Sequence, residues 1–284
     1  MKTSLKLMGR PLFLLCFFVV GFNLYAESAS VTADLTESTF TADLTESVFT
    51  LELRREIVIS TLSLGVFFGS FLIPETYEIP NLDRNNVIAI DRWLMFNYGS
   101  FNIVTTFMRP VVGVMPLIVP LVLMEWDLRN DFPIWLTYGI MYAQAVGFTY
   151  GTRRAIGRAV NRHRPIYYFA DVVERPIPAN AFPSGTTSMS FLPATMLSVT
   201  FSAEFPDSPW RIPVIVGSHT LATTVGIARI ITGHHFLTDV LAGAAIGSFF
   251  GWLIPTLHRR PGNDDESNLS FRFTGNGAMM SVRL

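Results

Sequence analysis

Charged side chains are scarce in this 284-residue chain. Asp, Glu, Lys and Arg together make up 15% of it, against about 25% in a typical soluble domain. Hydrophobic residues make up half of the chain, which indicates that lipid surrounds much of its surface. Charge of either sign is not in excess, because the net charge is −1, so no basic field favours nucleic acid as a partner. The composition is typical of an integral membrane protein.

Cysteine is nearly absent as well: Cys16 is the single one, so a disulfide framework within the chain is excluded. Cys16 lies in a short apolar run, residues 12–20, which follows three basic residues, Lys2, Lys6 and Arg10. Ala26 then supplies a small residue at which an export signal could be cleaved. We interpret residues 1–26 as a signal peptide or, if it is not cleaved, as a signal anchor.

Residues 27–53 are rich in small and polar side chains. They contain a tandem repeat of nine residues, first at 32–40 and again at 41–49. Two copies are too few to bury a continuous core as a solenoid does. We therefore expect a flexible spacer.

Long apolar runs dominate the rest of the chain up to residue 257, and a spanning helix needs about 20 such residues. There are six: residues 57–73, 111–124 (extended upstream by 101–107), 133–152, 186–203, 212–228 and 240–257. The sequence predicts an all-α fold, a polytopic bundle of about six transmembrane helices within residues 54–257. A soluble protein with buried helices is the alternative, and it tolerates apolar helices of this length less often. Residues 258–284 are expected to form a polar C-terminal tail.

Three polar segments adjoin these apolar runs. They are residues 158–165 (RAVNRHRP), 182–186 (FPSGT) and 229–239 (RIITGHHFLTD). The first follows the third run, the second precedes the fourth, and the last joins the fifth to the sixth. Antiparallel neighbouring helices place the end of one beside the start of the next, so we expect all three segments to meet at one face of the membrane.

The residue types in these segments suit a phosphate group. Arg164 and Arg229 offer forked, permanently charged donors. Ser184 and Gly185 stand where a helix is expected to begin, and free backbone N–H groups at a helix start bind anions. The four residues are therefore candidates for holding phosphate.

His235 and Asp239 are four residues apart and share one face of a predicted helix. Asp239 can accept a hydrogen bond from one imidazole nitrogen and leave the other nitrogen as a nucleophile. With the phosphate held by arginines and a helix start, the cluster supplies positioning, charge neutralisation and a nucleophile without a metal.

Each of these residues also has a simpler interpretation. Arginines at helix ends often anchor a protein at the lipid interface, and Asp239 could be a carboxylate favoured by the helix dipole. A metal site formed by His234, His235 and Asp239 is a less favoured alternative, because adjacent residues on a helix point about 100° apart. The co-occurrence and order of the three segments favour the phosphate site.

The three segments resemble the signature of the type 2 phosphatidic acid phosphatase (PAP2) family, which is related in its site to the vanadium haloperoxidases. That signature is Lys-x6-Arg-Pro, then Pro-Ser-Gly-His, then Ser-Arg-x5-His-x3-Asp. The matching residues here are Arg164-Pro165, Pro183-Ser184-Gly185, and Arg229, His235 and Asp239. The resemblance covers roughly residues 54–257. It implies a phosphohistidine intermediate at His235, phosphate held by Arg164, Ser184, Gly185 and Arg229, and no cofactor.

The chain departs from the family pattern at three positions. Gly157 occupies the place of the lysine, for which Arg158, or Arg154 one turn earlier, could substitute. Ala228 replaces the serine before Arg229. Thr186 replaces the histidine that protonates the leaving group in the family, so a relocated acid, for which His163 is the better candidate and His234 the other, an altered substrate and an inactive relative all remain open.

The resemblance implies a membrane-embedded lipid phosphatase or lipid pyrophosphatase that acts on a lipid phosphate among membrane lipids. A catalytically weak PAP2-fold protein that binds a lipid phosphate is the alternative. In bacteria the resemblance implies an inner-membrane protein whose site faces the periplasm. However, a cleaved signal followed by six spans would place residues 153–183 in the cytoplasm, as their arginines would also favour.

Overall fold

The computed structural model describes residues 47–78, 82–97, 102–124, 128–169, 177–260, 269–274 and 277–282. The predicted signal, residues 1–26, and the spacer up to residue 46 lie outside the described residues.

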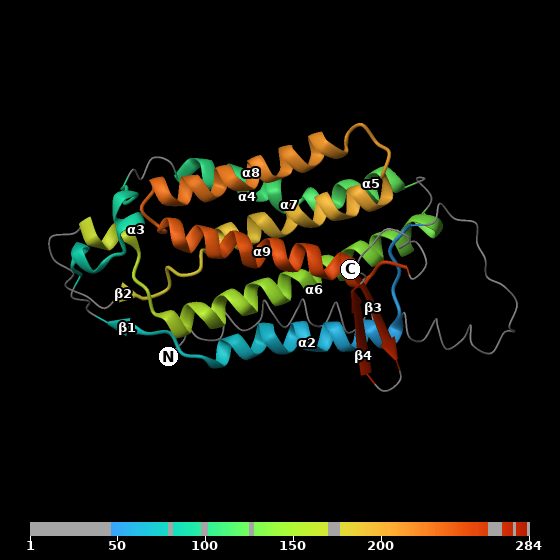
Figure 1. Ribbon diagram of the computed structural model, residues 1–284, viewed down its shortest axis with the longest axis horizontal. Coiled ribbons are helices and arrows are strands. Elements are labelled where there is room, and N and C mark those ends of the chain that lie inside the picture. Colours follow the sequence, from blue (N-terminus) through green and yellow to red (C-terminus); the bar gives the residue numbers. More distant parts are fainter. Residues whose placement is uncertain are drawn as a thin grey trace, which may run out of the picture. The chain divides into compact units, whose positions relative to one another are not determined.

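Helices form at all six predicted apolar runs (Figure 1). They are α2 (Leu53–Leu72), α4 (Asn102–Gly113) continued by η3 (Met115–Leu117) and α5 (Ile118–Leu123), α6 (Leu128–Val160), α7 (Gly185–Glu204), α8 (Arg211–Ile231) and α9 (Leu237–Leu257). Within the described part, four helical segments are long and apolar enough to cross a membrane: Leu53–Leu72, Val104–Leu123, Arg211–Ile231 and Leu237–Leu257. The expected helical membrane bundle is confirmed, although the number of spans is approximate.

Helices α7 and α9 pack with their backbones in close contact. Gly243, Gly247 and Gly251 repeat at every fourth position of α9, and each faces the backbone of α7. A Cβ atom added at Gly243 would lie 2.5 Å from the carbonyl oxygen of Ser184, and one at Gly251 would lie 2.5 Å from that of Leu192. Small residues at this spacing allow helices to approach closely in lipid. The contact fixes the start of α7 beside the start of α9.

A second close contact joins α2 to α6. Gly151 of α6 faces the carbonyl oxygen of Val66, which would lie 2.5 Å from an added Cβ atom. Ser63 of α2 donates its hydroxyl hydrogen to the carbonyl oxygen of Gln144 over 2.8 Å. Such a bond satisfies a hydroxyl that lipid could not hydrate.

Short elements cover the end of the bundle at which α6 ends and α7 and α9 begin. These are β1 (Tyr77–Glu78), paired antiparallel with β2 (Ile177–Pro178), and three helical turns, η1 (Arg84–Asn86), α3 (Ala89–Trp93) and η4 (Pro165–Phe169). Figure 1 shows α3, β1 and β2 gathered at this end. All three signature segments lie here.

The opposite end is closed by residues that the sequence placed outside the domain. Phe49, the last residue of the repeat, is buried in the core and forms an isolated bridge with Arg259. Glu204 accepts hydrogen bonds from the Ser47 hydroxyl at 2.6 Å and the Tyr138 hydroxyl at 2.9 Å. His258 is fully buried. Residues 47–49 and His258 therefore contact the helical bundle, and the domain boundaries at residues 53 and 258 stay a prediction.

The C-terminal tail contains regular structure. Strands β3 (Leu269–Thr274) and β4 (Gly277–Val282) pair as an antiparallel hairpin. The alternating sequence of residues 269–273 gave only a weak signal for a strand.

Candidate active site

The three signature segments meet through backbone hydrogen bonds. Ser184 donates its N–H to the carbonyl oxygen of Asp239 over 2.9 Å, which joins the second segment to the third. Ile166 donates its N–H to the carbonyl oxygen of Gly233 over 2.7 Å, which joins the first to the third. Gly233 has a φ of +69°, a conformation that glycine adopts without strain. The predicted convergence of the three segments is what the structure shows.

His235 lies in the connection between α8 and α9, and 4% of its surface is exposed. Its Nδ1 lies 2.7 Å from the carbonyl oxygen of Ala181. A carbonyl can only accept, so Nδ1 carries the hydrogen and the neutral ring keeps an unprotonated Nε2. An unprotonated imidazole nitrogen has a free lone pair and is chemically able to act as a nucleophile.

The surroundings of His235 favour its neutral form. Burial lowers its pKa, and the positive charges of Arg229 and Arg164 lower it further, whereas Asp239 acts in the opposite direction. A neutral imidazole is the nucleophilic form. The arrangement therefore keeps His235 ready to react near neutral pH.

Asp239 is not the hydrogen-bond partner that the sequence predicted for His235. Its Oδ2 lies 3.8 Å from Nδ1 of His235, beyond hydrogen-bond distance. The same oxygen accepts the N–H of Phe236 at 2.8 Å, which caps α9, and Oδ1 accepts from Arg162 at 2.7 Å. Asp239 acts on the imidazole as a nearby charge, while the backbone of Ala181 orients the ring.

The positive charges of Arg229 and Arg164 act on both His234 and His235 and lower the pKa of each. Within the described residues, neither arginine has a carboxylate partner, and the buried Nε of each has no hydrogen-bond partner. Buried donors are normally paired. In the part of the chain that the structure describes, these two guanidinium groups therefore keep an Nε–H group free to donate to an anion.

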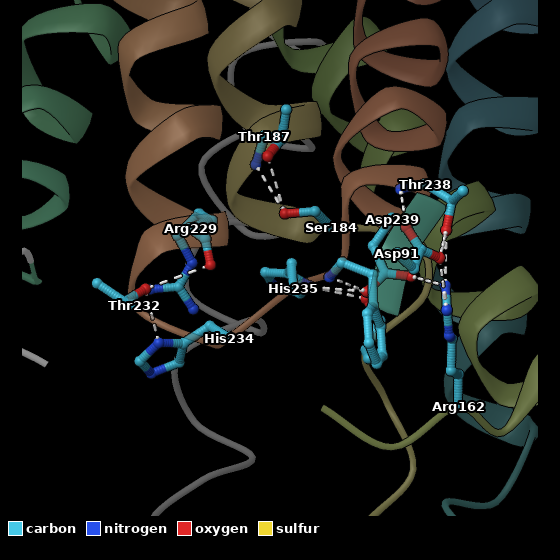
Figure 2. A network of polar contacts seen from close by, with 12 residues as sticks. Asp91, Arg162, Ser184, Thr187, Arg229, Thr232, His234, His235, Thr238 and Asp239 are labelled. Atoms are coloured by element: carbon cyan, nitrogen blue, oxygen red, sulfur yellow. Dashed lines mark hydrogen bonds and ion pairs between the residues drawn. The ribbon is translucent and has the colours of Figure 1, made fainter. Parts of the chain in front are cut away.

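Ser184 is the N-cap residue of α7 and is fully buried. Its Oγ accepts from the hydroxyl of Thr187 at 2.8 Å. Gly185 and Thr186 are the first residues of the helix, where backbone N–H groups lack intrahelical acceptors. Figure 2 shows Ser184 at the start of α7, Arg229 at the end of α8 and His235 in the connection that follows α8.

Gly157 occupies the place of the lysine in the family signature, and the side chains of the three arginines around it have different contacts. Arg158 forms an ion pair with Glu75 at 3.1 Å, and the Arg154 guanidinium lies 4.2 Å from the ring centroid of Phe71. Arg153 instead lies over the start of α7, because a Cβ atom added at Gly185 would be 2.8 Å from its Cζ. The sequence analysis did not predict Arg153 as a residue of the site.

Gly157 itself has a packing reason. An added Cβ atom would lie 2.9 Å from the carbonyl oxygen of Phe182, so a side chain does not fit there. Arg153 precedes Gly157 by one helical turn and shares its face of α6. That spacing is the signal that could have identified Arg153 as the cation nearest to Gly185.

Two further residues that the sequence did not single out adjoin the site. Arg162 donates to both Asp239 and Asp91 at 2.7 Å, and Asp91 reaches Thr238 at the start of α9 (Figure 2). Asp91 lies 71 residues from Arg162 and 147 residues from Thr238 in sequence, in a five-residue helix without a motif. No local pattern could have predicted this contact.

The candidate proton donors differ in position. His163 is buried and stands between Arg162 and Arg164 in the chain. His234 bonds through Nδ1 to the Thr232 hydroxyl at 2.9 Å, and burial together with Arg229 and Arg164 lowers its pKa to about 4. His234 is therefore neutral near pH 7 and is a poor acid.

Fold and site together define a helical membrane protein with a cluster of arginines around a buried histidine. Residues 135–262 match the family model of the PAP2 superfamily. This region, 128 of the 284 residues, carries most of α6 and all of α7, α8 and α9 with the three signature segments. The resemblance drawn from the sequence is confirmed.

Two individual proteins are similar to this chain. A lipid A 1-phosphatase from Porphyromonas gingivalis is 36% identical over 87 residues, which are 29% of this chain and 18% of that protein. The chain thus matches under a fifth of this relative's length. A crystal structure of a transmembrane PAP2-type phosphatidylglycerolphosphate phosphatase from Bacillus subtilis aligns over 71% of this chain and 94% of its own, with a TM-score of 0.36 and 20% identity.

Proposed function

We propose that this protein is a membrane-embedded lipid phosphatase or lipid pyrophosphatase that works through a phosphohistidine at His235. The observation that carries the proposal is the hydrogen bond from Nδ1 of His235 to Ala181, which leaves Nε2 unprotonated. Arg164 and Arg229 act on the same ring, and the Nε of each has no hydrogen-bond partner among the described residues. The match of residues 135–262 to the PAP2 superfamily and the similarity to a protein named as a lipid A 1-phosphatase support it.

The reaction has two steps. In the first, Nε2 of His235 attacks phosphorus; the new N–P bond forms as the P–O bond to the lipid breaks, and the leaving oxygen takes a proton or departs as an anion. In the second, water attacks the same phosphorus, the N–P bond breaks, and inorganic phosphate leaves with the neutral histidine restored. Arg164, Arg229 and the N–H groups at the start of α7 hold the phosphate oxygens as charge develops on them.

The arginines and the helix start neutralise the phosphate charge, so we propose that the reaction needs no divalent metal. In this proposal the substrate's phosphate head occupies the site at one membrane face, and its apolar part stays among the surrounding helices and lipids. Arg153 joins the phosphate-binding groups in place of the lysine of the family signature, since it lies nearest to Gly185.

A panel assay of phosphate release tests the proposal. Purified protein in lipid micelles is offered phosphatidic acid, diacylglycerol pyrophosphate, a polyprenyl pyrophosphate and lipid A. We expect release from at least one, loss of nearly all activity in His235→Ala, and a much milder effect in His234→Ala, whose ring bonds to Thr232 instead. A folded His235→Ala protein that retains substantial activity would overturn the mechanism.

A chelator and vanadate complete the test. Rates should be nearly unchanged in chelator, and vanadate should inhibit because its trigonal-bipyramidal form resembles the transition state. Loss of activity in chelator that magnesium or zinc restores would show that a metal takes part.

Thr186 gives a reason to consider a second function, a catalytically weak protein that binds a lipid phosphate. Threonine cannot donate a proton near neutral pH as the histidine of the family signature does. A protein that binds vanadate or a lipid phosphate, but releases no phosphate from any member of the panel, would favour this second function.

A further inference from the structure

A buried ionic network lies behind the nucleophile, and the two-step reaction above does not use it. Arg162 is at its centre: Nη1 donates to Oδ1 of Asp239 and to the hydroxyl of Thr238, and Nη2 donates to Oδ2 of Asp91, each at 2.7 Å. Figure 2 shows Arg162 between the two carboxylates, on the side of Asp239 away from Arg229.

Asp91 is the anchor of α3. It is the one buried residue of that helix and is fully enclosed, whereas Ile90 and Trp93 are exposed. Its carboxylate accepts the backbone N–H of Thr238 at 3.0 Å and the Thr238 hydroxyl at 2.6 Å. Because a carboxylate is costly to bury unless it is paired, this short helix is held against α9 by polar contacts rather than by apolar packing.

Arg162 also contacts both groups that lie beside the imidazole of His235, the Asp239 carboxylate and the backbone of Ala181. Its guanidinium holds Asp239, and its carbonyl oxygen accepts the N–H of Ala181 at 2.8 Å. The carbonyl of Ala181 in turn accepts Nδ1–H of His235. The guanidinium rests 3.9 Å from the ring centroid of Phe236, the residue after His235. One side chain and its own backbone therefore link every contact that fixes the ring.

We propose that Arg162 and Asp91 are positioning residues for the pair His235 and Asp239, an inference that rests on the function proposed above. Arg162 fixes the Asp239 carboxylate at its distance from the ring, and Asp91 fixes Arg162. Neither residue touches the phosphate. Misplacing a reacting group by about 1 Å can reduce the rate about 10²-fold, so the effect falls on turnover rather than on substrate binding.

Steady-state kinetics of four variants test the role. Arg162→Met should lower kcat by about 10²-fold and leave KM within about threefold, because the phosphate-binding groups are untouched. Arg162→Lys keeps the positive charge and should therefore recover part of the lost kcat. The recovery should be incomplete, because an ammonium lacks the planar fork that meets two carboxylates. Asp91→Asn, which keeps size and removes charge, should lower kcat by about tenfold.

Arg84→Met is the matched control. Arg84 also lies over a phenylalanine ring, at 4.5 Å from Phe169, and donates to a backbone carbonyl, but it is exposed and outside the network. Its kcat should stay within about twofold of the parent. A folded Arg162→Met or Asp91→Asn protein whose kcat matches that of Arg84→Met would overturn the positioning role. If Arg162→Met does not fold, Asp91→Asn and Arg162→Lys decide.

A spectroscopic measurement separates this inference from the proposed function. In protein labelled with ¹⁵N-histidine, the His235 signal, identified by its loss in His235→Ala, reports which ring nitrogen carries hydrogen. We expect the Nδ1–H form in the parent and a mixture of the two forms in Arg162→Met and Asp91→Asn. A changed mixture in a protein that releases no phosphate would support the positioning and contradict the lipid phosphatase. An unchanged signal in both variants would contradict the positioning, whatever the activity.

Discussion

Nδ1 of His235 donates a hydrogen bond to the carbonyl oxygen of Ala181, three residues before Ser184. The bond connects His235, the proposed nucleophile, directly to the segment that begins α7. The ring orientation is thereby set by the same stretch of backbone that leads into the proposed phosphate-binding residues, and a side-chain substitution cannot remove the acceptor. Asp239 instead caps α9 and places a negative charge near the ring.

The rate should depend on pH through His235. Because burial, Arg229 and Arg164 lower its pKa, the protonated and inactive form should accumulate only below about pH 6.5, the ordinary value. We expect kcat/KM to fall as pH decreases, with its acid midpoint below 6.5, and to be constant above it. Phosphate groups titrate as well, so the profile is measured on two substrates of different phosphate pKa; a shared midpoint belongs to the enzyme. A shared midpoint above 6.5 would contradict this assignment.

Thr186 should bias the enzyme toward good leaving groups. General acid catalysis raises a rate by about 10²–10⁴-fold. Its loss slows the reaction most when the leaving group is an alkyl alcohol and least when the leaving group is a phosphate. We expect faster hydrolysis of lipid pyrophosphates than of phosphatidic acid, and Thr186→His should raise the monoester rate more than the pyrophosphate rate.

His163→Ala is the matched test of a relocated acid. If His163 donates the proton, this variant should selectively harm the monoester, and the parent should show no preference for the pyrophosphate. Equal parent rates on both substrates, with no gain in Thr186→His, would count against the leaving-group account.

Restoring a side chain at Gly157 should destabilise the protein. The added Cβ atom would meet the carbonyl oxygen of Phe182, and overpacking of this kind costs about 1–3 kcal/mol. We expect Gly157→Ala to lower the thermal unfolding midpoint in detergent. Gly139→Ala on the same helix, with nothing within 4 Å of the new atom, is the control and should not lower it. Equal unfolding midpoints for the two variants would show that the backbone at Phe182 can shift without a loss of stability.

The two ends of the bundle should label from opposite sides of the membrane. Asp83 is exposed at the end that carries the site, and Asp207 is exposed in the connection between α7 and α8 at the other end. We propose that the site faces the periplasm. After Cys16 is replaced, Asp83→Cys should react with a membrane-impermeant maleimide in intact cells, and Asp207→Cys only in permeabilised cells. The reverse pattern would place the site in the cytoplasm.

That proposal constrains the N-terminal region. Residues 47–50 contact residues 258–260 and Glu204 at the end opposite His235. A periplasmic site therefore requires residue 47 to lie on the cytoplasmic side, which conflicts with a cleaved export signal at residue 26. The labelling experiment decides between the two sequence-based expectations.

The sequence by itself determined the membrane bundle and the convergence of three segments. Apolar runs of spanning length leave few folds open, because lipid demands helices or closed barrels. The spacing of Arg229, His235 and Asp239 placed them on one short stretch of chain, from the end of α8 to the start of α9. These features are local, so composition and spacing suffice to predict them.

Only the tertiary structure decided what each polar group contacts. Ala181 rather than Asp239 orients His235, Arg153 rather than Arg158 lies over Gly185, and Arg158 pairs with Glu75. Each contact depends on how closely two helices approach or on a rotamer, and neither is encoded in residue spacing. The Asp91–Arg162–Asp239 network joins segments far apart in the chain, because a buried charge takes whichever partner the packing brings within reach.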